Sequence, residues 1–225
     1  MTVTETDLSF MREAVPFWNK LTEAQQRQLE QVVTVRNYQQ GENIHRGAEK
    51  CTGFLLVESG QVRAFILSDS GKEITLYRLF ERDTCIFSAA CIMKNINFDI
   101  YLEAEHDTRI LLIPTAVYNE LNQNSLAVSD FTNQLMSSRF SDVMWVMEQV
   151  LFMSFDRRLA NFLLEQCVIE GSDTLTITHE TIAKNLGSAR EVVTRMLKYF
   201  QNEGMVTLFR GGITVTDKKK LEKLQ

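Results

Sequence analysis

The chain changes character once, at Pro114, and this change limits the folds that it can adopt. Before it, from about Val35, short runs rich in β-branched and aromatic residues alternate with turn signals such as Ser59-Gly60 and Asp69-Ser70-Gly71. After it, the 40 residues of 115–154 contain neither Gly nor Pro, which predicts helix. The sequence therefore predicts an antiparallel β-sandwich or roll followed by a long helix.

Six runs before Pro114 carry the strand pattern, and further turn signals stand at Gly41-Glu42 and His106-Asp107. In chain order the runs are VRNYQ, TGFLLVES, QVRAFILS, EITLYRLF, FDIYLEAE and TRILLIP. Ahead of them, residues 21–33 predict a short amphipathic helix with Thr22 as its N-cap. We therefore expect an α+β fold whose first domain, residues 1–114, is an antiparallel β-roll.

The glycine-free stretch places apolar residues at alternating spacings of four and three, the pattern of a two-stranded coiled coil. It predicts a helical region over residues 115–154 that pairs with a second copy of the chain through Met136, Phe140, Val143, Met147 and Val150. The alternative is a helix that packs only on its own domain. A further helix is expected over Asp156–Gln166, within a third domain at residues 155–225.

Charge divides the chain in a similar way. The formal net charge is −5, but residues 171–225 sum to +3 and residues 1–170 to −8. No apolar stretch approaches the roughly 18 residues that span a bilayer. The first 15 residues have neither the basic nor the apolar region of a secretory signal. We expect a cytoplasmic protein without a membrane role, in which a basic module is attached to an acidic one.

The most informative segment is THETIAKNLGSAREVVTRMLKYF, residues 178–200. Thr178 is placed to cap a first helix, Ala183 is small enough for a close helix crossing, and Gly187 gives a tight turn its backbone freedom. Ser188 and Glu191 have the spacing of a capping box for a second helix. The apolar contacts between the helices would come from Ile182, Leu186, Val192, Val193, Met196 and Leu197. This pattern predicts a DNA-reading helix-turn-helix.

The exposed face of the second helix would present Arg190, Glu191, Thr194 and Arg195 to the bases. Either arginine can donate a bidentate pair to guanine, and the glutamate can accept a hydrogen bond from cytosine. For Glu191 the alternative is a capping role alone.

Phosphate contacts are expected from residues around this face, namely Thr178, His179, Ser188, Lys198 and Arg210. Arg210 belongs to MVTLFRGGITVTD, which predicts two short strands joined at Arg210-Gly211-Gly212 and hence a wing hairpin. The alternative for Arg210 is an ordinary solvated arginine in a loop.

Over essentially its whole length the chain resembles the CRP/FNR family of bacterial regulators, named for the cyclic-AMP receptor protein and the fumarate and nitrate regulator. The most specific match is IAKNLGSAREVVTRML, because the family's recognition helix carries Arg/Val-Glu-x-x-Ser/Gly-Arg at the positions of Arg190, Glu191, Thr194 and Arg195. The resemblance implies a cyclic-nucleotide-binding-like sensor roll, a dimerisation helix reaching Ser154 and a C-terminal winged helix-turn-helix. It also implies a homodimer that reads a palindrome in double-stranded DNA, with RNA polymerase and a small-molecule effector as partners. Half-sites of the TGTGA or TTGAT type are implied, and Arg190 together with Glu191 favours TGTGA.

The chain departs from the family at the effector site. Cyclic-nucleotide binding uses a Gly-Glu-Leu turn followed by Arg-Ser, whereas residues 83–103 contain no Gly-Glu and have Asn97-Phe98 in the place of Arg-Ser. A phosphate would meet no cation there, so we expect no binding of cyclic AMP. The family's iron–sulfur regulators use cysteines near the N-terminus, and none precedes Cys51 here. The effector and any cofactor therefore stay unidentified.

Two thiols, Cys85 and Cys91, bracket the family's ligand-responsive turn and are candidates for an effector or redox site, with Arg82 as the nearest cation in sequence. The alternative is that both are small buried hydrophobic residues. Cys167 lies on an apolar helix and is expected to fill the core. The three histidines, His45, His106 and His179, lack ligand spacing, so no metal site is expected.

The sequence thus predicts a sequence-specific DNA-binding transcriptional regulator, controlled by an unidentified effector at the N-terminal roll. No catalytic pattern stands out, so we do not expect an enzyme. The alternative function is a sensor module whose winged helix binds protein rather than DNA. The exposed Arg and Lys residues on the reading face favour DNA.

Overall fold

The computed structural model describes residues 3–47, 53–86 and 99–224. The chain divides into two compact units, which are described separately. The N-terminal unit consists of Met1–Leu67 and Leu76–Val143, and the C-terminal unit consists of Ser68–Thr75 and Met144–Gln225. None of the helices in the described residues is both long and apolar enough to cross a bilayer.

The N-terminal unit opens with helices. The first, α1 (Glu5–Ala14), was not predicted, and Thr4 and Asp7 form a capping box at its start. A short 3-10 turn, η1 (Trp18–Lys20), and α2 (Glu23–Val32) follow. The predicted cap of α2 is confirmed, because the Thr22 side chain accepts from the Gln25 N–H while the Gln25 side chain accepts from the Thr22 N–H.

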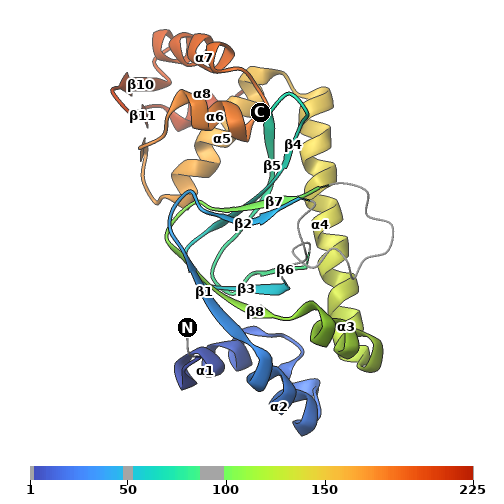
Figure 1. The fold of residues 1–225 in the computed structure, drawn as a ribbon. Helices are drawn as coiled ribbons and strands as arrows, with labels where there is room; N and C mark the ends of the chain where they lie inside the picture. Colours follow the sequence, from blue (N-terminus) through green and yellow to red (C-terminus); the bar gives the residue numbers. More distant parts are fainter. Residues whose placement is uncertain (1–2, 48–52, 87–98, 225) are drawn as a thin grey trace. The chain divides into compact units, whose positions relative to one another are not determined.

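Two antiparallel four-stranded sheets form the β-roll and confirm the predicted fold class (Figure 1). The first has the order β1 (Thr34–Tyr38), β8 (Thr108–Ile113), β3 (Phe54–Ser59) and β6 (Thr84–Cys85). The second has the order β2 (Asn43–Arg46), β7 (Tyr101–Ala104), β4 (Val62–Leu67) and β5 (Glu73–Leu79). All six predicted runs contain a strand, whereas β2 and β6 were not predicted.

The core of the N-terminal unit is aromatic. The rings of Phe54 and Tyr118 stack with their centroids 4.4 Å apart, and Phe17 and Phe131 pack around them. The Tyr118 hydroxyl lies 2.8 Å from the Thr132 hydroxyl, so this buried polar group has a partner. Because Thr132 belongs to the long helix, these contacts fix the start of that helix against the roll.

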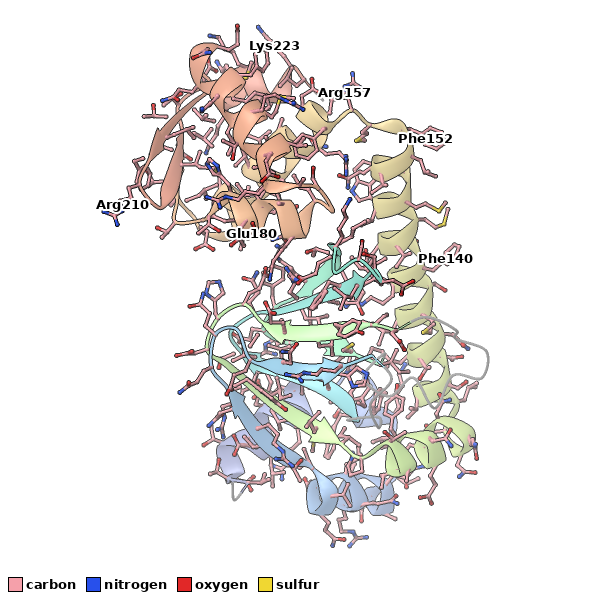
Figure 2. The ribbon with its side chains drawn as sticks, turned by 45° about the horizontal axis from the view of Figure 1, so that its top comes forward. Phe140, Phe152, Arg157, Glu180, Arg210 and Lys223 are labelled. Atoms are coloured by element: carbon pink, nitrogen blue, oxygen red, sulfur yellow. The ribbon has the colours of Figure 1, made fainter. Side chains whose placement is uncertain are left out.

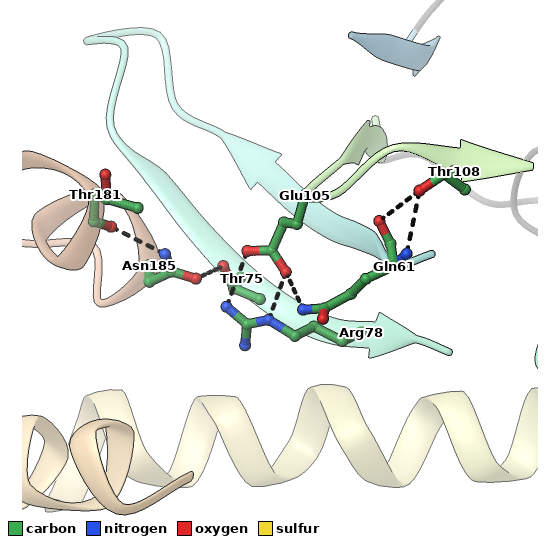
Figure 3. Close-up of polar contacts among 7 residues, drawn as sticks. All are labelled: Gln61, Thr75, Arg78, Glu105, Thr108, Thr181 and Asn185. Atoms are coloured by element: carbon green, nitrogen blue, oxygen red, sulfur yellow. Dashed lines mark hydrogen bonds and ion pairs between the residues drawn. The ribbon is translucent and has the colours of Figure 1, made fainter. Parts of the chain in front are cut away.

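One buried polar cluster stabilises the roll (Figure 3). The Arg78 Nε lies 2.6 Å from Glu105 Oε2, and the Gln61 amide donates to the same oxygen at 2.6 Å. Gln61 is held in turn by Thr108, whose hydroxyl both accepts from the Gln61 N–H and donates to its carbonyl, each at 3.1 Å. Because both charges are satisfied, the cluster avoids the penalty of an unpaired buried ion.

The stretch predicted as continuous helix is two helices, α3 (Thr115–Asn124) and α4 (Leu126–Phe152). Ser125 separates them in an extended conformation, with φ −130° and ψ 115°. In the last turn of α3, the Asn124 side chain donates to the Glu120 carbonyl at 2.9 Å. Polar side chains that bond to nearby backbone weaken a helix in this way, and neither Gly nor Pro was needed for the break.

Serine hydroxyls along α4 also bond to its own backbone. The Ser137 hydroxyl donates to the Asn133 carbonyl at 2.9 Å, and the Ser141 hydroxyl donates to the Ser137 carbonyl at 3.1 Å. Each carbonyl lies four residues before its donor, so both serines satisfy their polar atoms within the helix.

The C-terminal unit packs helices around a small sheet. Its helices are α5 (Phe155–Ile169), α6 (His179–Asn185), α7 (Arg190–Asn202) and α8 (Lys218–Glu222). The sheet has the order β10 (Val206–Phe209), β11 (Gly212–Val215) and β9 (Thr174–Leu175). The predicted wing hairpin is therefore present as β10 and β11. The core joins all these elements through fully buried residues that include Leu163, Ile182, Leu197, Phe200 and Ile213.

Candidate nucleic-acid interface

The helix pair α6–α7 forms as its local sequence requires. Thr178 is the N-cap of α6, and its hydroxyl accepts from the Thr181 N–H at 3.0 Å. Ala183 is buried where the helices meet, and Gly187 has a φ of +63°, the left-handed conformation that favours glycine. These three predictions are confirmed. The pair is a helix-turn-helix.

The capping box predicted at Ser188 and Glu191 is wrong. The N-cap of α7 is Ala189, which makes no side-chain hydrogen bond, and the helix begins at Arg190. Ser188 still belongs to the turn, because its N–H donates to the Ala183 carbonyl at 2.9 Å. Glu191 therefore lies in the first turn without a capping partner, where a carboxylate still interacts favourably with the helix dipole.

The outer face of α7 carries the three charged residues predicted to read bases. Arg190, Glu191 and Arg195 are exposed, and none of their side chains has a hydrogen bond or ion pair with the residues that the structure describes. The opposite face is fixed by Val193 and Leu197, which are fully buried. A rigid helix thus presents three charges that lack intramolecular partners, as groups that bind an external ligand require.

Thr194, the fourth predicted reading residue, is bonded inside the helix pair. Its hydroxyl donates to the Arg190 carbonyl at 2.9 Å and lies 2.9 Å from Nδ1 of His179. Because the hydroxyl proton points to the carbonyl, the His179 ring acts as the donor, which places its proton on Nδ1. Burial, and to a smaller degree Arg190, lower the pKa of His179, which favours the neutral ring.

The predicted phosphate contacts differ in accessibility. Lys198 is exposed on α7, and Arg210 is exposed at the turn between β10 and β11, where Figure 2 shows its side chain projecting from the wing. Thr178 and His179 are already engaged by the contacts described above, and Ser188 is partly buried in the turn.

A second group of contacts holds the end of α6, and the sequence did not predict it. Residues 68–75, which group with the C-terminal unit, bring Glu73 to 3.3 Å from Lys184. In the same segment the Thr75 hydroxyl donates to Asn185 at 2.7 Å (Figure 3). Asn185 in turn donates to the Thr181 carbonyl at 2.9 Å. The partners are about 110 residues apart in sequence, so no local pattern indicates them.

The same segment closes over the helix-turn-helix turn. Ile74 pairs with Leu186 in an isolated antiparallel bridge. A Cβ added to Gly187 would lie 2.4 Å from Cγ1 of Ile74. Gly187 is therefore required by close packing as well as by its φ angle.

Of the predicted sensor thiols, the structure describes only Cys85, because Cys91 lies outside the described residues, as do Cys51 and Asn97-Phe98. Cys85 is buried, with its sulfur 3.8 Å from the Tyr77 hydroxyl. The cation of this region is Arg139, which lies 4.4 Å from the centre of the Tyr77 ring and donates to the Thr84 carbonyl at 3.4 Å. Arg82, the sequence candidate, instead pairs with acids on the surface.

Two further expectations concern cysteine and metal chemistry. Cys167 is a buried member of the C-terminal core, which confirms its predicted role, and burial raises the pKa of its thiol. Among the described residues, no group of three or more His, Cys, Asp or Glu side chains is arranged to hold a metal ion.

The predicted dimer seam on α4 is largely uncovered. Phe140, Met147 and Val150 are exposed, with 66%, 46% and 42% of their surface accessible. Val143 is partly buried, and Met136 packs against the N-terminal core. The exposed apolar surface extends beyond the predicted positions to Met144, Trp145, Leu151 and Phe152. In Figure 2 the side chains of Phe140 and Phe152 extend away from the helix.

Family profiles match both parts of the chain. Residues 157–224 match the Crp-like helix-turn-helix domain, and residues 35–125 match the cyclic nucleotide-binding domain. A β-roll of this type, a long helix and a winged helix-turn-helix define a class of transcriptional regulators that bind DNA through the C-terminal part.

Individual relatives narrow the class to a family. A crystal structure described as a regulator of the CRP/FNR family from Eubacterium rectale is 52% identical, has a TM-score of 0.93, and is matched over 95% of this chain and 99% of that one. Regulatory protein HlyX of Actinobacillus pleuropneumoniae is 26% identical over 87% of this chain and 83% of its own length. A global nitrogen regulator of Synechococcus elongatus is 25% identical over 80% and 85%. The chain belongs to the CRP/FNR family of transcriptional regulators.

Proposed function

We propose that the protein is a homodimer that reads a palindromic DNA site with Arg190, Glu191 and Arg195, under the control of an effector bound at the N-terminal roll. The observation that carries the proposal is the set of three exposed charges on α7 that have no partner among the described residues, above a fully buried inner face. Water solvates these exposed charges in the free protein, so all three side chains are available to an external partner.

The chemistry of these side chains assigns their roles. Arg190 and Arg195 each present a planar fork that fits guanine O6 and N7, and Glu191 accepts from the amino group of cytosine. The loss of the predicted capping box removes the alternative that capping alone explains Glu191. We propose half-sites of the TGTGA type, as the resemblance of the recognition helix implies.

The residues around the reading face set its position on the duplex. Lys198 and Arg210 are exposed cations suited to phosphate, and Thr178, His179 and Ser188 border the same helix pair. For Thr194 we propose a positioning role toward the bases through its bonds to Arg190 and His179, because its hydroxyl is already used.

Dimerisation is proposed through α4. Its exposed apolar side chains, from Phe140 to Phe152, form the kind of surface that soluble proteins cover by association. Two recognition helices must lie about one helical turn of DNA apart to read a palindrome, so a paired α4 is the element that sets their spacing. The division of the chain into three domains, at residues 1–114, 115–154 and 155–225, stays a prediction.

The effector is proposed to be something other than cyclic AMP, because the family's Gly-Glu and Arg-Ser pairs are missing from residues 83–103. Burial of Cys85 favours a packing role for that thiol over a redox role. A cytoplasmic location and contact with RNA polymerase follow from the family and are proposed with it.

Gel-shift titration at several salt concentrations tests the proposal, with a TGTGA palindrome and a scrambled duplex. Arg195→Ala should weaken binding to the palindrome by about 1–3 kcal/mol and relax preference at one base pair. Lys198→Ala, the matched loss of one exposed cation on the same helix, should weaken both duplexes alike and lower the salt dependence. Equal weakening of both duplexes by Arg195→Ala would refute base reading.

The alternative function, a sensor whose winged helix binds protein, predicts a different result. In that case the wild-type protein would show no salt-dependent binding to either duplex.

A further inference from the structure

The arginines of the N-terminal unit have partners, with two exceptions. This part of the chain has acids in excess, so a partner is easy to find. Among the described residues, seven arginines of the unit make an ion pair, a hydrogen bond or a ring contact: Arg12, Arg27, Arg63, Arg78, Arg82, Arg109 and Arg139. Arg36 and Arg46 make none with the described residues, although both are exposed.

Arg36 and Arg46 both line the same hollow. It has a volume of about 490 Å³ and lies where β1 contributes Arg36 and Tyr38 and β2 contributes Asn43 and Arg46. β1 and β2 are edge strands of the two different sheets, so within the described parts of the chain neither is paired on its outer side. Two unpaired cations have thus been brought together by strands from separate sheets.

The other lining groups suit an anion. Glu42 is the one acid in the lining, and its carboxylate accepts from the Gln39 N–H at 2.7 Å, which ties it to the turn between the strands. Burial raises the pKa of Tyr38, and Glu42 adds to this while Arg36 opposes it, so the phenol keeps its proton and can donate. Asn43 adds an amide that can donate as well.

We propose that this hollow binds a small organic anion with two acidic groups, either carboxylates or phosphates. Each guanidinium can hold one such group through paired hydrogen bonds. A cleft lined by cations concentrates the field toward an anion, which matters in a unit that otherwise repels one. The volume falls within the roughly 300–1,000 Å³ of metabolite sites and exceeds what a single inorganic ion needs.

None of the residues that line the hollow belongs to residues 83–103, where the family resemblance places the nucleotide cassette, so we assign the hollow a ligand of its own. The proposal does not depend on DNA reading, because its ligand binds the N-terminal unit.

Calorimetric titration of the full chain at low ionic strength tests it. Pyrophosphate is the phosphate probe and citrate the carboxylate probe. We expect at least one of them to bind, and we expect Arg36→Gln and Arg46→Gln each to weaken that probe about tenfold or more. Both side chains are exposed and unpaired among the described residues, so neither replacement removes a contact of the fold.

Arg27→Gln is the matched control, because it removes the same charge from the same unit outside the hollow. Arg27 is exposed, and among the described residues its side chain contacts Glu23, through an ion pair at 3.8 Å and a hydrogen bond to the Glu23 carbonyl at 3.3 Å. The Arg27→Gln replacement should leave the affinity for the probe nearly unchanged. Absence of heat with both probes would overturn the proposal, as would equal weakening by Arg27→Gln. Binding of a glutamate-rich peptide but of neither small anion would also overturn it and would identify an acidic protein segment as the occupant.

Measured without probe, Arg36→Gln and Arg46→Gln should bind the TGTGA palindrome as tightly as the wild type. Failure of the anion site would therefore leave the DNA-binding test intact, and failure of DNA binding would leave the calorimetric test intact.

Discussion

Gly187→Ala is expected to destabilise the helix-turn-helix for two separable reasons. At a φ of +63° an L-residue costs about 1–2 kcal/mol relative to glycine. The new methyl would also lie 2.4 Å from Cγ1 and 2.7 Å from Cδ1 of Ile74, so that side chain must move. Because Ile74 is only partly buried and can turn away, the overlap should add about 1 kcal/mol, at the low end for overpacking. The expected total is about 2–3 kcal/mol.

Gly211→Ala isolates the backbone contribution. Gly211 has a φ of +88°, and an added Cβ would meet nothing within 4 Å. It should therefore cost only about 1–2 kcal/mol. Ile74→Ala isolates the overlap, because Gly187→Ala in that background should cost no more than Gly211→Ala.

Native-state hydrogen exchange of the α7 amides gives the free energy of unfolding of this region for all variants. The coupling between positions 74 and 187 follows from the double-mutant cycle. Equal costs for Gly187→Ala and Gly211→Ala, or a Gly187→Ala cost that persists without the Ile74 side chain, would refute the packing argument.

Three further outcomes are expected. Thr22→Ala should lower stability by about 0.5–2 kcal/mol through loss of the α2 cap, measured by thermal unfolding, and an unchanged midpoint would contradict the capping role. Because burial and Arg190 lower the pKa of His179, the unfolded chain binds the proton more tightly, so stability should fall as the pH drops through and below about 6.5. His179→Gln should flatten this part of the pH dependence in urea titrations, and an identical profile would exclude the residue as its source. Phe140→Glu should dissociate the proposed dimer in sedimentation experiments while Ser138→Glu, on the same helix, does not; an unchanged dimer in Phe140→Glu would argue against α4 as the interface.

Elements with a strong local pattern were predictable. The strands of the roll stand out as short runs rich in β-branched and aromatic residues between turn signals. Thr22 and Thr178 each lie directly before a helix, and their hydroxyls accept from an N–H of its first turn. Helix α1 was missed although Thr4 and Asp7 carry a readable capping pattern. The break at Ser125 was missed because neither Gly nor Pro marks it, and the polar residues around it resemble ordinary helix surface in sequence.

In the candidate site, too, features with a local sequence pattern were predictable and features that depend on the folded chain were not. The identity and exposure of Arg190, Glu191 and Arg195 follow from helical periodicity. The position of the α7 N-cap does not follow from the sequence. Ser188 and Ala189 are adjacent candidates, and the bond from the Ser188 N–H to the Ala183 carbonyl keeps Ser188 in the turn before the helix. The contacts of Glu73, Ile74 and Thr75 with the end of α6 join residues about 110 positions apart, and only the folded chain brings them together.

The backbone-bonded serines of α4 affect what can cover that helix. Ser137 and Ser141 place their hydroxyl protons on carbonyls of their own helix, so an apolar surface laid over them would remove little hydrogen bonding to water. A helix can thus keep polar residues beside Phe140 and remain soluble while uncovered, yet lose little when a partner excludes the water. Replacing these serines by alanine would add to the apolar surface that the uncovered helix exposes to water.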